Sequence, residues 1–366
     1  MKAIRVGMTL EQLWQRAPGG SGTYIRELLH AMPGSAADVD TIGLAARHQR
    51  PDELALTVPV YSSSLPRTIL YEAWNRFRSP RVPSPELDVL HATTWAVPPR
   101  SRPLVVTVHD LAFLRTPEHF TPRGVDYFRR ALRIVEREAD LVLVPSQTTA
   151  DDCSRHGITS DRLRLVPHGV APPHVTTDAV TQFQAKHALR GPYVLWCGTL
   201  EPRKNLGTLV AAFERVAAVD PDVQLALAGP DGWGNAGADL ARLLGGPVGK
   251  RVVRLGRLSD DELAAAYSGA RGFCFPSLWE GFGMPVLEAM AYGVPVVTSA
   301  DTSMAEFASG AALLVDPLDP AALAEAILEA IGPAHDILSE LASGRAQKFS
   351  WRDSAAATAQ AYRDVK

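Results

Sequence analysis

The segment FPSLWEGFGMPVLEAMAYGVP, residues 275–295, decides the fold more directly than any other stretch of this sequence. It begins in an apolar run typical of a buried strand, and Pro276 ends that strand. A glycine-punctuated loop carrying Glu280 follows, and Pro285 suits the first position of a helix whose first turn would carry Glu288. The segment therefore predicts a strand, a loop and a helix, with two carboxylates facing one cleft.

These two acids point to the kind of ligand such a cleft would take. A carboxylate accepts two hydroxyl hydrogen bonds, so Glu280 and Glu288 can each hold a sugar diol. Backbone N–H groups around residues 282–284, at the helix start, can meet phosphate oxygens. A solvated glutamate on a helix gives the same bare spacing, because glutamate is a good helix former.

Outward from this segment, apolar runs of strand length alternate with helical stretches along the whole chain. In the second half we expect strands at 193–197, 224–228, 252–255, 272–275, 295–298 and 312–315, and helices at 205–218, 238–244, 260–266, 285–292 and 320–331. In the first half we expect strands at 3–8, 89–92, 104–109, 141–145 and 163–166, and helices near 21–32, 122–139 and 148–156. This alternation predicts an α/β protein with parallel sheets covered by helices on both faces.

The chain is long enough for two domains, since 366 residues exceed the usual size of one. Residues 168–177 are rich in proline and polar residues without periodicity, which is typical of a linker. We therefore expect an N-terminal domain at 1–176 and a C-terminal domain at 177–349. The last helix, about 350–366, comes after the second domain is complete and is expected to pack back on the first.

Composition and charge exclude several classes of protein. Hydrophobic residues make up 46% and charged residues 21%, which excludes a disordered or fibrous chain. A net charge of −3 argues against a general nucleic-acid binder. The three cysteines form no C-x-x-C pair, so no disulfide framework or zinc site is expected, and a reducing cytoplasm fits best. No stretch reaches the 18 uncharged apolar residues of a membrane span, and we interpret the apolar start as a strand rather than a signal peptide.

A second segment with chemical character is GTLEPRKN, residues 198–205, which follows a predicted strand and enters a helix. Arg203 can chelate phosphate oxygens through its fork, and Lys204 acts as a point charge. Two cations at a helix N-terminus oppose the helix dipole unless an anion sits there. The segment therefore favours a pyrophosphate site, with a solvated turn as the alternative.

Two segments of the first half are weaker signals. PGGSGTY, residues 18–24, follows the first strand, and Gly19 and Gly20 let backbone N–H groups approach an anion. Its spacing is not G-x-G-x-x-G, so it is no dinucleotide fingerprint, and a plain strand-to-helix turn explains it equally well. Asp38 and Asp40 have the D-x-D spacing of some metal–nucleotide sites, but they lie beside no phosphate loop, and we interpret the spacing as chance.

Residues 65–82 carry four arginines against the single acid Glu72. Leu70, Trp74 and Phe77 fall on one helical face. We favour a helix docked on the first domain with a solvated basic edge. Contact with a membrane surface or with an anionic sugar acceptor is the alternative.

Taken together, these motifs resemble the retaining glycosyltransferases of family 4 (glycosyltransferase group 1). Residues 280–288 look like the family's E-x7-E signature, 198–205 like its pyrophosphate motif, 166–170 like its P-N-G-V turn with His168 in place of Asn, and Gly19-Gly20 like its glycine pair. The resemblance covers nearly the whole chain. It implies the GT-B fold, two Rossmann-like parallel-sheet domains facing across a cleft, with the acceptor held by the first and the nucleotide sugar by the second.

The resemblance also implies roles for individual residues. His109, Glu280, Arg203 and Lys204 are expected to be catalytic, with Arg203 and Lys204 on the diphosphate leaving group, Glu280 on the transferred sugar and His109 facing that sugar. Glu288 is expected to hold the ribose, and the base would lie near Leu258. The full set expected to bind the donor is Gly19, Gly20, Thr199, Arg203, Lys204, Leu258, Glu280, Gly281, Phe282, Gly283, Met284, Pro285, Val286 and Glu288.

The segment VHDL, residues 108–111, taken together with residues 198–205, is most similar to the corresponding segments of bacterial mannosyltransferases of polysaccharide biosynthesis that use GDP-mannose. We therefore expect GDP-mannose as co-substrate, no other cofactor and no metal. The acceptor is expected to be a saccharide or glycolipid, and the location cytoplasmic, with the inner face of the plasma membrane as a possible site. The alternatives are a UDP- or ADP-sugar donor, a UDP-sugar 2-epimerase-like isomerase, and a non-catalytic nucleotide-sugar-binding protein.

Overall fold

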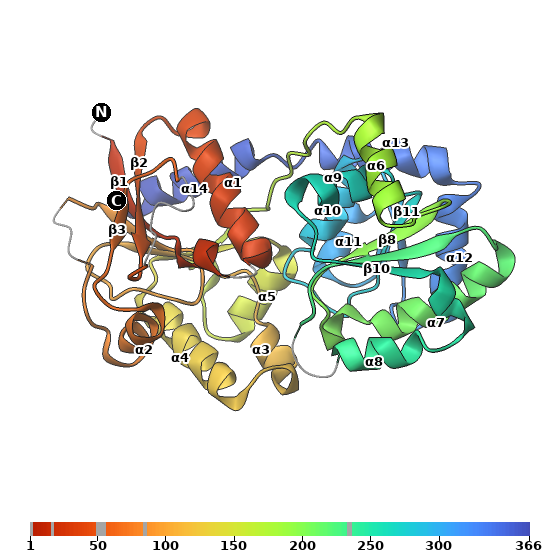
Figure 1. Cartoon of the computed structure of the whole chain (residues 1–366). Helices are drawn as coiled ribbons and strands as arrows, with labels where there is room; N and C mark the ends of the chain where they lie inside the picture. The colour runs from red at the N-terminus through yellow and green to blue at the C-terminus, as the bar shows by residue number, and fades with distance from the viewer. Residues whose placement is uncertain (1–2, 16–17, 49–55, 83–85, 233–235) are drawn as a thin grey trace. The chain divides into compact units, whose positions relative to one another are not determined.

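The computed structural model describes residues 3–15, 18–48, 56–82, 86–232 and 236–366. Its internal contacts divide the chain into two compact units, one of Met1–Gly169 with Phe349–Lys366 and one of Val170–Lys348. Each unit is built on one sheet in which every pair of neighbouring strands is parallel, with helices packed against it (Figure 1). The predicted α/β class with parallel sheets is confirmed.

The first unit has a seven-stranded sheet with the order β3-β2-β1-β4-β5-β6-β7. Its strands are β1 (Ile4–Thr9), β2 (Val39–Ala45), β3 (Val60–Ser62), β4 (Val89–Ala92), β5 (Leu104–Thr107), β6 (Leu141–Val144) and β7 (Leu163–Leu165). The sequence analysis did not predict β2 and β3. Both lie toward one edge of the sheet, where Asp40 and most of β3 are exposed, so their apolar signal is diluted.

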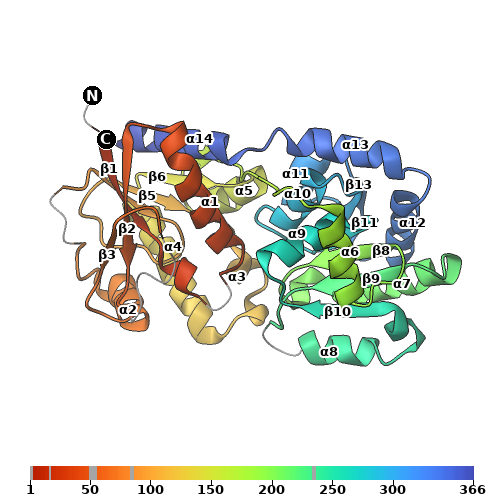
Figure 2. The ribbon, with the colours of Figure 1, turned by 45° about the horizontal axis from the view of Figure 1, so that its top comes forward.

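The helices of the first unit include a C-terminal one that comes from the far end of the chain. They are α1 (Gly19–Ser35), α2 (Arg67–Phe77), α3 (Ala112–Arg115), α4 (Pro122–Glu138), α5 (Gln147–Arg155) and α14 (Trp351–Val365), with short 3-10 turns η1 (Glu11–Trp14), η3 (Pro117–His119) and η4 (Ser160–Arg162). Figures 1 and 2 both show α14 beside α1, and it also packs on β1. The backbone of Gly169 runs so close to that of Trp351 that an added Cβ would lie 2.1 Å from the Trp351 nitrogen.

The second unit has a six-stranded sheet with the order β10-β9-β8-β11-β12-β13. Its strands are β8 (Tyr193–Cys197), β9 (Gln224–Ala228), β10 (Val252–Gly256), β11 (Gly272–Phe275), β12 (Val296–Ser299) and β13 (Leu313–Val315). All six were predicted, because buried parallel strands appear in the sequence as continuous apolar runs. The strand order reverses between β8 and β11, and open parallel sheets bind ligands at the carboxyl ends of such strands.

The helices of the second unit flank this sheet. They are α6 (Thr177–Lys186), α7 (Leu206–Val219), α8 (Ala236–Leu243), α9 (Asp260–Ser268), α10 (Met284–Ala291), α11 (Ser303–Ala308), α12 (Pro320–Ile331) and α13 (His335–Ala346), with the 3-10 turns η5 (Pro202–Lys204) and η6 (Pro247–Arg251). The sequence analysis did not predict α6, α11 or α13. Helix α6 buries only Phe183, so it has almost no apolar stripe to detect.

The basic segment 65–82 forms α2, and its packing corrects one part of the prediction. Leu70 and Trp74 are buried as expected, but the Phe77 side chain is 75% exposed and does not belong to that face. The helix docks through Leu70 and Trp74, with Leu65, Tyr71 and Val82 packed beside them. Across the described part of the chain, no helix is both long enough and apolar enough to cross a bilayer.

Candidate functional site

Arg203 and Lys204 lie in the turn that follows β8, at the point where the strand order of the second sheet reverses. They occupy the 3-10 turn η5 rather than the first turn of a helix. Helix α7 starts after them, at Leu206, and its N-cap residue Asn205 has a left-handed backbone with φ 57°. The Arg203 carbonyl accepts a hydrogen bond of 2.8 Å from the Leu278 N–H, which ties this turn to the loop after β11.

Glu280 lies in the loop after β11, and its carboxylate bonds both cations. Its Oε1 atom lies 2.7 Å from Arg203 Nη1 and 2.5 Å from Lys204 Nζ, and Ser277 Oγ donates to the same oxygen at 2.6 Å. Arg203 also pairs through Nε with Glu201 at 2.9 Å. These contacts form a compact ionic cluster at the carboxyl ends of β8 and β11. Two cations next to the start of a helix require a neighbouring anion, and the chain itself supplies it.

The cluster is buried, and burial shapes the ionisation of its members. Burial acts to raise the pKa of Glu280, but Arg203 and Lys204 outweigh it and hold that pKa below its usual value. The pKa of Lys204 is lowered by burial first and by Arg203 second, and Glu280 opposes both effects. The Lys204 ammonium also lies 4.8 Å from the centre of the Phe275 ring, a favourable cation–π distance.

Buried hydroxyl groups hold the backbone of the Glu280 loop in place. Thr298 Oγ1 donates to the Phe275 carbonyl at 2.9 Å, Ser299 Oγ to the Ser277 carbonyl at 2.7 Å, and Ser303 Oγ to the Glu280 carbonyl at 2.8 Å. All three hydroxyl residues are fully buried. Sequence reasoning missed them and Ser277, because serine and threonine are too common for their positions to stand out.

Glu288 lies on α10, beyond its first turn, which corrects the predicted position. Gly283 precedes the helix with φ 98°, and an added Cβ there would lie 2.4 Å from Met304 Cγ, so glycine is required on both counts. The Glu288 carboxylate accepts a hydrogen bond of 2.9 Å from the Tyr267 hydroxyl. Burial raises the pKa of Glu288, although the Tyr267 bond acts against the shift.

The other residues expected to bind the donor in this unit lie on the same edge of the sheet. Thr199 follows β8 and Leu258 follows β10, and both are partly exposed. Phe282 and Val286 are buried, and the Val286 N–H donates to the Gly283 carbonyl at 3.0 Å. Gly281, Met284 and Pro285 complete the segment between Glu280 and α10.

Among the predicted residues of the first unit, His109 lies where β1, β4 and β5 end. His109 follows β5, and its Nε2 donates to the Thr93 carbonyl at 3.0 Å, while Thr93 in turn bonds Thr9 at the end of β1. The Tyr24 ring meets the His109 imidazole edge-on at 4.9 Å, and the His168 ring lies 5.5 Å from it. Gly19 and Gly20 are exposed at the start of α1, and Gly19 has φ 61°.

Burial favours the neutral form of three histidines of this unit. Burial lowers the pKa of His109, although Asp110 and the Thr93 carbonyl act against it. Burial also lowers the pKa of His168 far below its usual value and that of His91 to about 3. His91 bonds the hydroxyls of Tyr362 on α14 and Thr107 on β5, at 2.7 and 2.8 Å.

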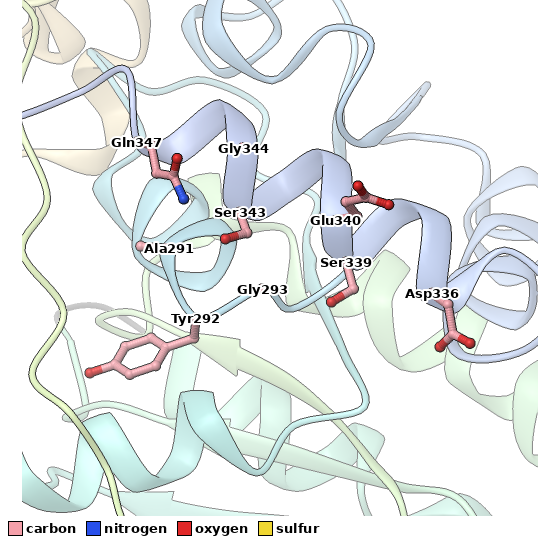
Figure 3. Close-up of a pocket in the computed structure, with 9 residues that line it drawn as sticks. All are labelled: Ala291, Tyr292, Gly293, Asp336, Ser339, Glu340, Ser343, Gly344 and Gln347. Atoms are coloured by element: carbon pink, nitrogen blue, oxygen red, sulfur yellow. The ribbon is translucent and has the colours of Figure 1, made fainter.

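Two features outside these groups bear on ligand binding. Asp38 pairs with Arg363 on α14 at 2.6 Å, and Asp40 lies on β2, at the opposite end from the strand's carboxyl edge, so their spacing builds no nucleotide site. An open pocket of about 550 Å³ lies between the end of α10 and α13 (Figure 3). None of the site residues predicted from the sequence lines this pocket.

Comparisons with known proteins define the class. Residues 191–332 match the family of glycosyl transferases group 1, and residues 18–174 match Glycosyltransferase Family 4. O-antigen chain mannosyltransferase B of Escherichia coli is 31% identical over 285 residues, which cover 75% of this chain and 74% of that protein. D-inositol 3-phosphate glycosyltransferase of Pseudarthrobacter chlorophenolicus is 29% identical over an alignment that covers 96% of this chain and 92% of that protein.

Solved structures show the same fold. HepE from Anabaena, solved with UDP and glucose, aligns with a TM-score of 0.76 at 19% identity and covers 99% of this chain and 100% of its own. WaaG, a glycosyltransferase involved in lipopolysaccharide biosynthesis, aligns with a TM-score of 0.69 at 17% identity, with 99% of each chain covered. The protein is therefore a glycosyltransferase enzyme of the GT-B fold, which uses a nucleotide-sugar donor and a saccharide acceptor. It belongs to family 4, the group 1 glycosyltransferases.

Proposed function

We propose that this enzyme transfers mannose from GDP-mannose to a saccharide or glycolipid acceptor, with retention of the anomeric configuration. The observation that carries the proposal is the buried cluster of Arg203, Lys204 and Glu280 at the carboxyl ends of β8 and β11. The choice of mannose is supported by O-antigen chain mannosyltransferase B and by the Escherichia coli serotype-specific mannosyltransferase WbdA, which is 28% identical.

In this proposal the two cations stabilise the leaving group. Cleaving the bond between sugar and phosphate leaves negative charge on the diphosphate, and groups fixed in place before the reaction stabilise such charge at little reorganisation cost. Arg203 supplies a planar fork and Lys204 a point charge. No metal is then required, and we expect transfer to persist in the presence of a chelator such as EDTA.

The acids and His109 act on the rest of the donor. In the structure, Oε1 of Glu280 bonds Ser277 and the cations, and we expect its carboxylate to accept sugar hydroxyls when the phosphates of the donor bind those cations. Glu288 holds the ribose, oriented by the Tyr267 hydroxyl. His109 presents a neutral imidazole toward the transferred sugar, because burial lowers its pKa.

A donor panel tests the proposal. Thermal melting is followed with GDP, UDP and ADP and with their sugars, since a ligand that binds only the native state must raise its stability. GDP and GDP-mannose should give the largest rise. A larger rise with UDP or ADP compounds would replace GDP-mannose by the alternative donor, and a flat response to all of them contradicts donor binding. The anomeric configuration of the product, read by NMR, tests retention.

We further propose that α2 contacts an anionic lipid surface at the inner face of the plasma membrane. The Ile69 and Phe77 side chains are 55% and 75% exposed on this helix, and Arg67, Arg76 and Arg81 are exposed on or beside it. Apolar side chains among basic ones suit the interface of an anionic bilayer. The Phe77→Ser variant should lose binding to vesicles of mixed neutral and anionic lipid, and equal binding by the variant contradicts the contact.

A further inference from the structure

We propose that Glu280 is an internal competitor of the diphosphate, and that this competition makes the enzyme bind its donor in preference to its nucleoside-diphosphate product. The inference rests on the proposed function, since it takes the donor to be a nucleotide sugar. In the structure, the Glu280 carboxylate holds the two cations that the diphosphate needs.

The contacts concentrate on a single atom. Oε1 of Glu280 takes the bonds from Arg203, Lys204 and Ser277. Glu280 is therefore bound through the side of its carboxylate that faces the cations. We expect a phosphate oxygen that binds the same N–H groups of Arg203 and Lys204 to take the place of Oε1.

The charges of the cluster make this replacement costly. Arg203 and Lys204 carry two positive charges, and Glu201 and Glu280 carry two negative ones, so the cluster is neutral as a whole. Residue exposures of 8% for Glu201, 6% for Lys204 and 8% for Glu280 place these charges away from water, where each interaction is stronger than at the surface. Displacing Glu280 without giving it new partners leaves a buried charge unpaired, which is strongly unfavourable.

Donor and product differ in what they offer the displaced carboxylate. A nucleotide sugar brings hydroxyl groups that can donate to Glu280 while its phosphates take the cations. A nucleoside diphosphate brings the phosphates alone, so Glu280 loses its cations and gains no hydroxyl in return. Glu280 therefore opposes the product more than the donor, and its return to the cations speeds release of the product.

Substitutions of the two acids separate this role from a scaffolding role. Glu280→Gln keeps the shape and the acceptor oxygen but removes the charge that competes. Glu201→Gln removes the same charge from the same cluster, but the Glu201 carboxylate pairs with Nε of Arg203, and the contact of Glu201 with Lys204 is a backbone one, in which the Glu201 carbonyl accepts from the Lys204 N–H at 3.0 Å. If only net charge matters, the two variants behave alike; if Glu280 competes directly, Glu280→Gln has the larger effect.

The experiment is calorimetric titration of the full-length chain with GDP and UDP, and with the matching nucleotide sugar. For Glu280→Gln we expect the nucleoside diphosphate to bind about tenfold more tightly, the low end of coupling between close charge pairs. Glu201→Gln should show a smaller gain, and the nucleotide sugar should gain less than the diphosphate in Glu280→Gln. A gain in affinity cannot come from a damaged fold.

Three outcomes overturn the inference: unchanged or weaker diphosphate binding by Glu280→Gln, an equal gain in both variants, or an equal gain for donor and product. If wild-type protein binds nucleoside diphosphates but Glu280→Gln shows no gain in affinity for them, this inference alone is contradicted. If wild-type protein binds no nucleotide, the proposed function is contradicted as well. Should Glu280→Gln fail to fold, Ser277→Ala provides the second test, because it loosens the hold on Oε1 and should tighten diphosphate binding a few-fold.

Discussion

The carboxyl edges of the two sheets carry opposite kinds of chemistry. In the second unit, Arg203, Lys204 and Glu280 form a buried ionic cluster whose charges compensate one another. In the first unit, His109 and Tyr24 form an aromatic group in which burial lowers the pKa of the histidine and keeps it neutral. The paired cations thus lie at the edge expected to meet the phosphates, while the other edge, which also carries Glu11 and Asp110, offers uncharged hydrogen-bonding rings suited to sugar hydroxyls.

The largest effect should come from removing a cation of the second unit. Arg203→Ala and Lys204→Ala should each reduce kcat by about 100-fold or more, because each removes a group that stabilises leaving-group charge. Steady-state transfer assays measure the loss, with circular dichroism to verify folding. Arg254→Ala is the matched control, since Arg254 pairs with the exposed Asp231 in the same unit. Normal turnover in both variants would contradict the role of the charged cluster of the second unit in stabilising the leaving group.

The neutral histidines of the first unit predict a dependence of stability on pH. Their folded pKa values lie below the unfolded value, so the unfolded chain binds more protons as pH falls below about 6.5. The free energy of unfolding should therefore fall as pH drops from 7 toward 5, by up to about 1.4 kcal/mol per pH unit for each fully shifted histidine.

Calorimetry of His168→Asn tests this, because that variant carries one such histidine fewer and should show a shallower slope. His156→Asn, an exposed position of the same unit, is the control and should keep the wild-type slope. Identical slopes in wild-type protein and His168→Asn would contradict the prediction.

Glu288 should show a smaller effect, with activity and stability moving in opposite directions. Burial raises its pKa, so its charged form costs stability at neutral pH, and this cost disappears as pH falls through the raised pKa. Glu288→Gln should therefore melt a few degrees higher at pH 7, with a gain that shrinks on acidification, while nucleotide affinity falls about fivefold through lost ribose hydrogen bonds. A lower melting temperature at pH 7 would show that the charged carboxylate stabilises the fold.

The smallest effect is expected at Asp38. Its carboxylate pairs with Arg363 near the start of β2, so it serves the docking of α14 rather than the chemistry. Asp38→Asn should leave transfer unchanged, both with added magnesium or manganese and with a chelator. A metal-dependent loss of activity would revive the D-x-D interpretation.

The second unit could be predicted from the sequence much further than the first. Its central strands β8, β9, β11 and β12 are mostly buried apolar runs. Arg203, Lys204 and Glu280 are charged residues in glycine- and proline-containing segments at strand ends, where few structural explanations compete. In the first unit the edge strands β2 and β3 gave little signal. Phe77 was assigned to a buried face by helical periodicity alone, although the helix docks through Leu70 and Trp74.

What the sequence could not predict is pairing between distant residues. The bond between His91 and Tyr362 joins positions 271 residues apart, and the hydroxyls of Ser299 and Ser303 act on carbonyl groups more than twenty residues earlier. Nor did the two motifs show that Glu280 and the cations bond one another directly. These contacts depend on how the strands are ordered in the sheet, which local patterns do not encode.

The passage of the chain through both units has a consequence for how the protein is made. Helix α14 gives the first unit its Tyr362 and Trp351, so residues up to Gly169 cannot reach their final packing until the last helix has left the ribosome. The second unit, uninterrupted from Val170 to Lys348, is synthesised completely before that moment. During translation, the face of α1 that packs against α14 therefore stays uncovered until α14 has been made. We expect nascent chains stalled before residue 349 to depend on chaperones.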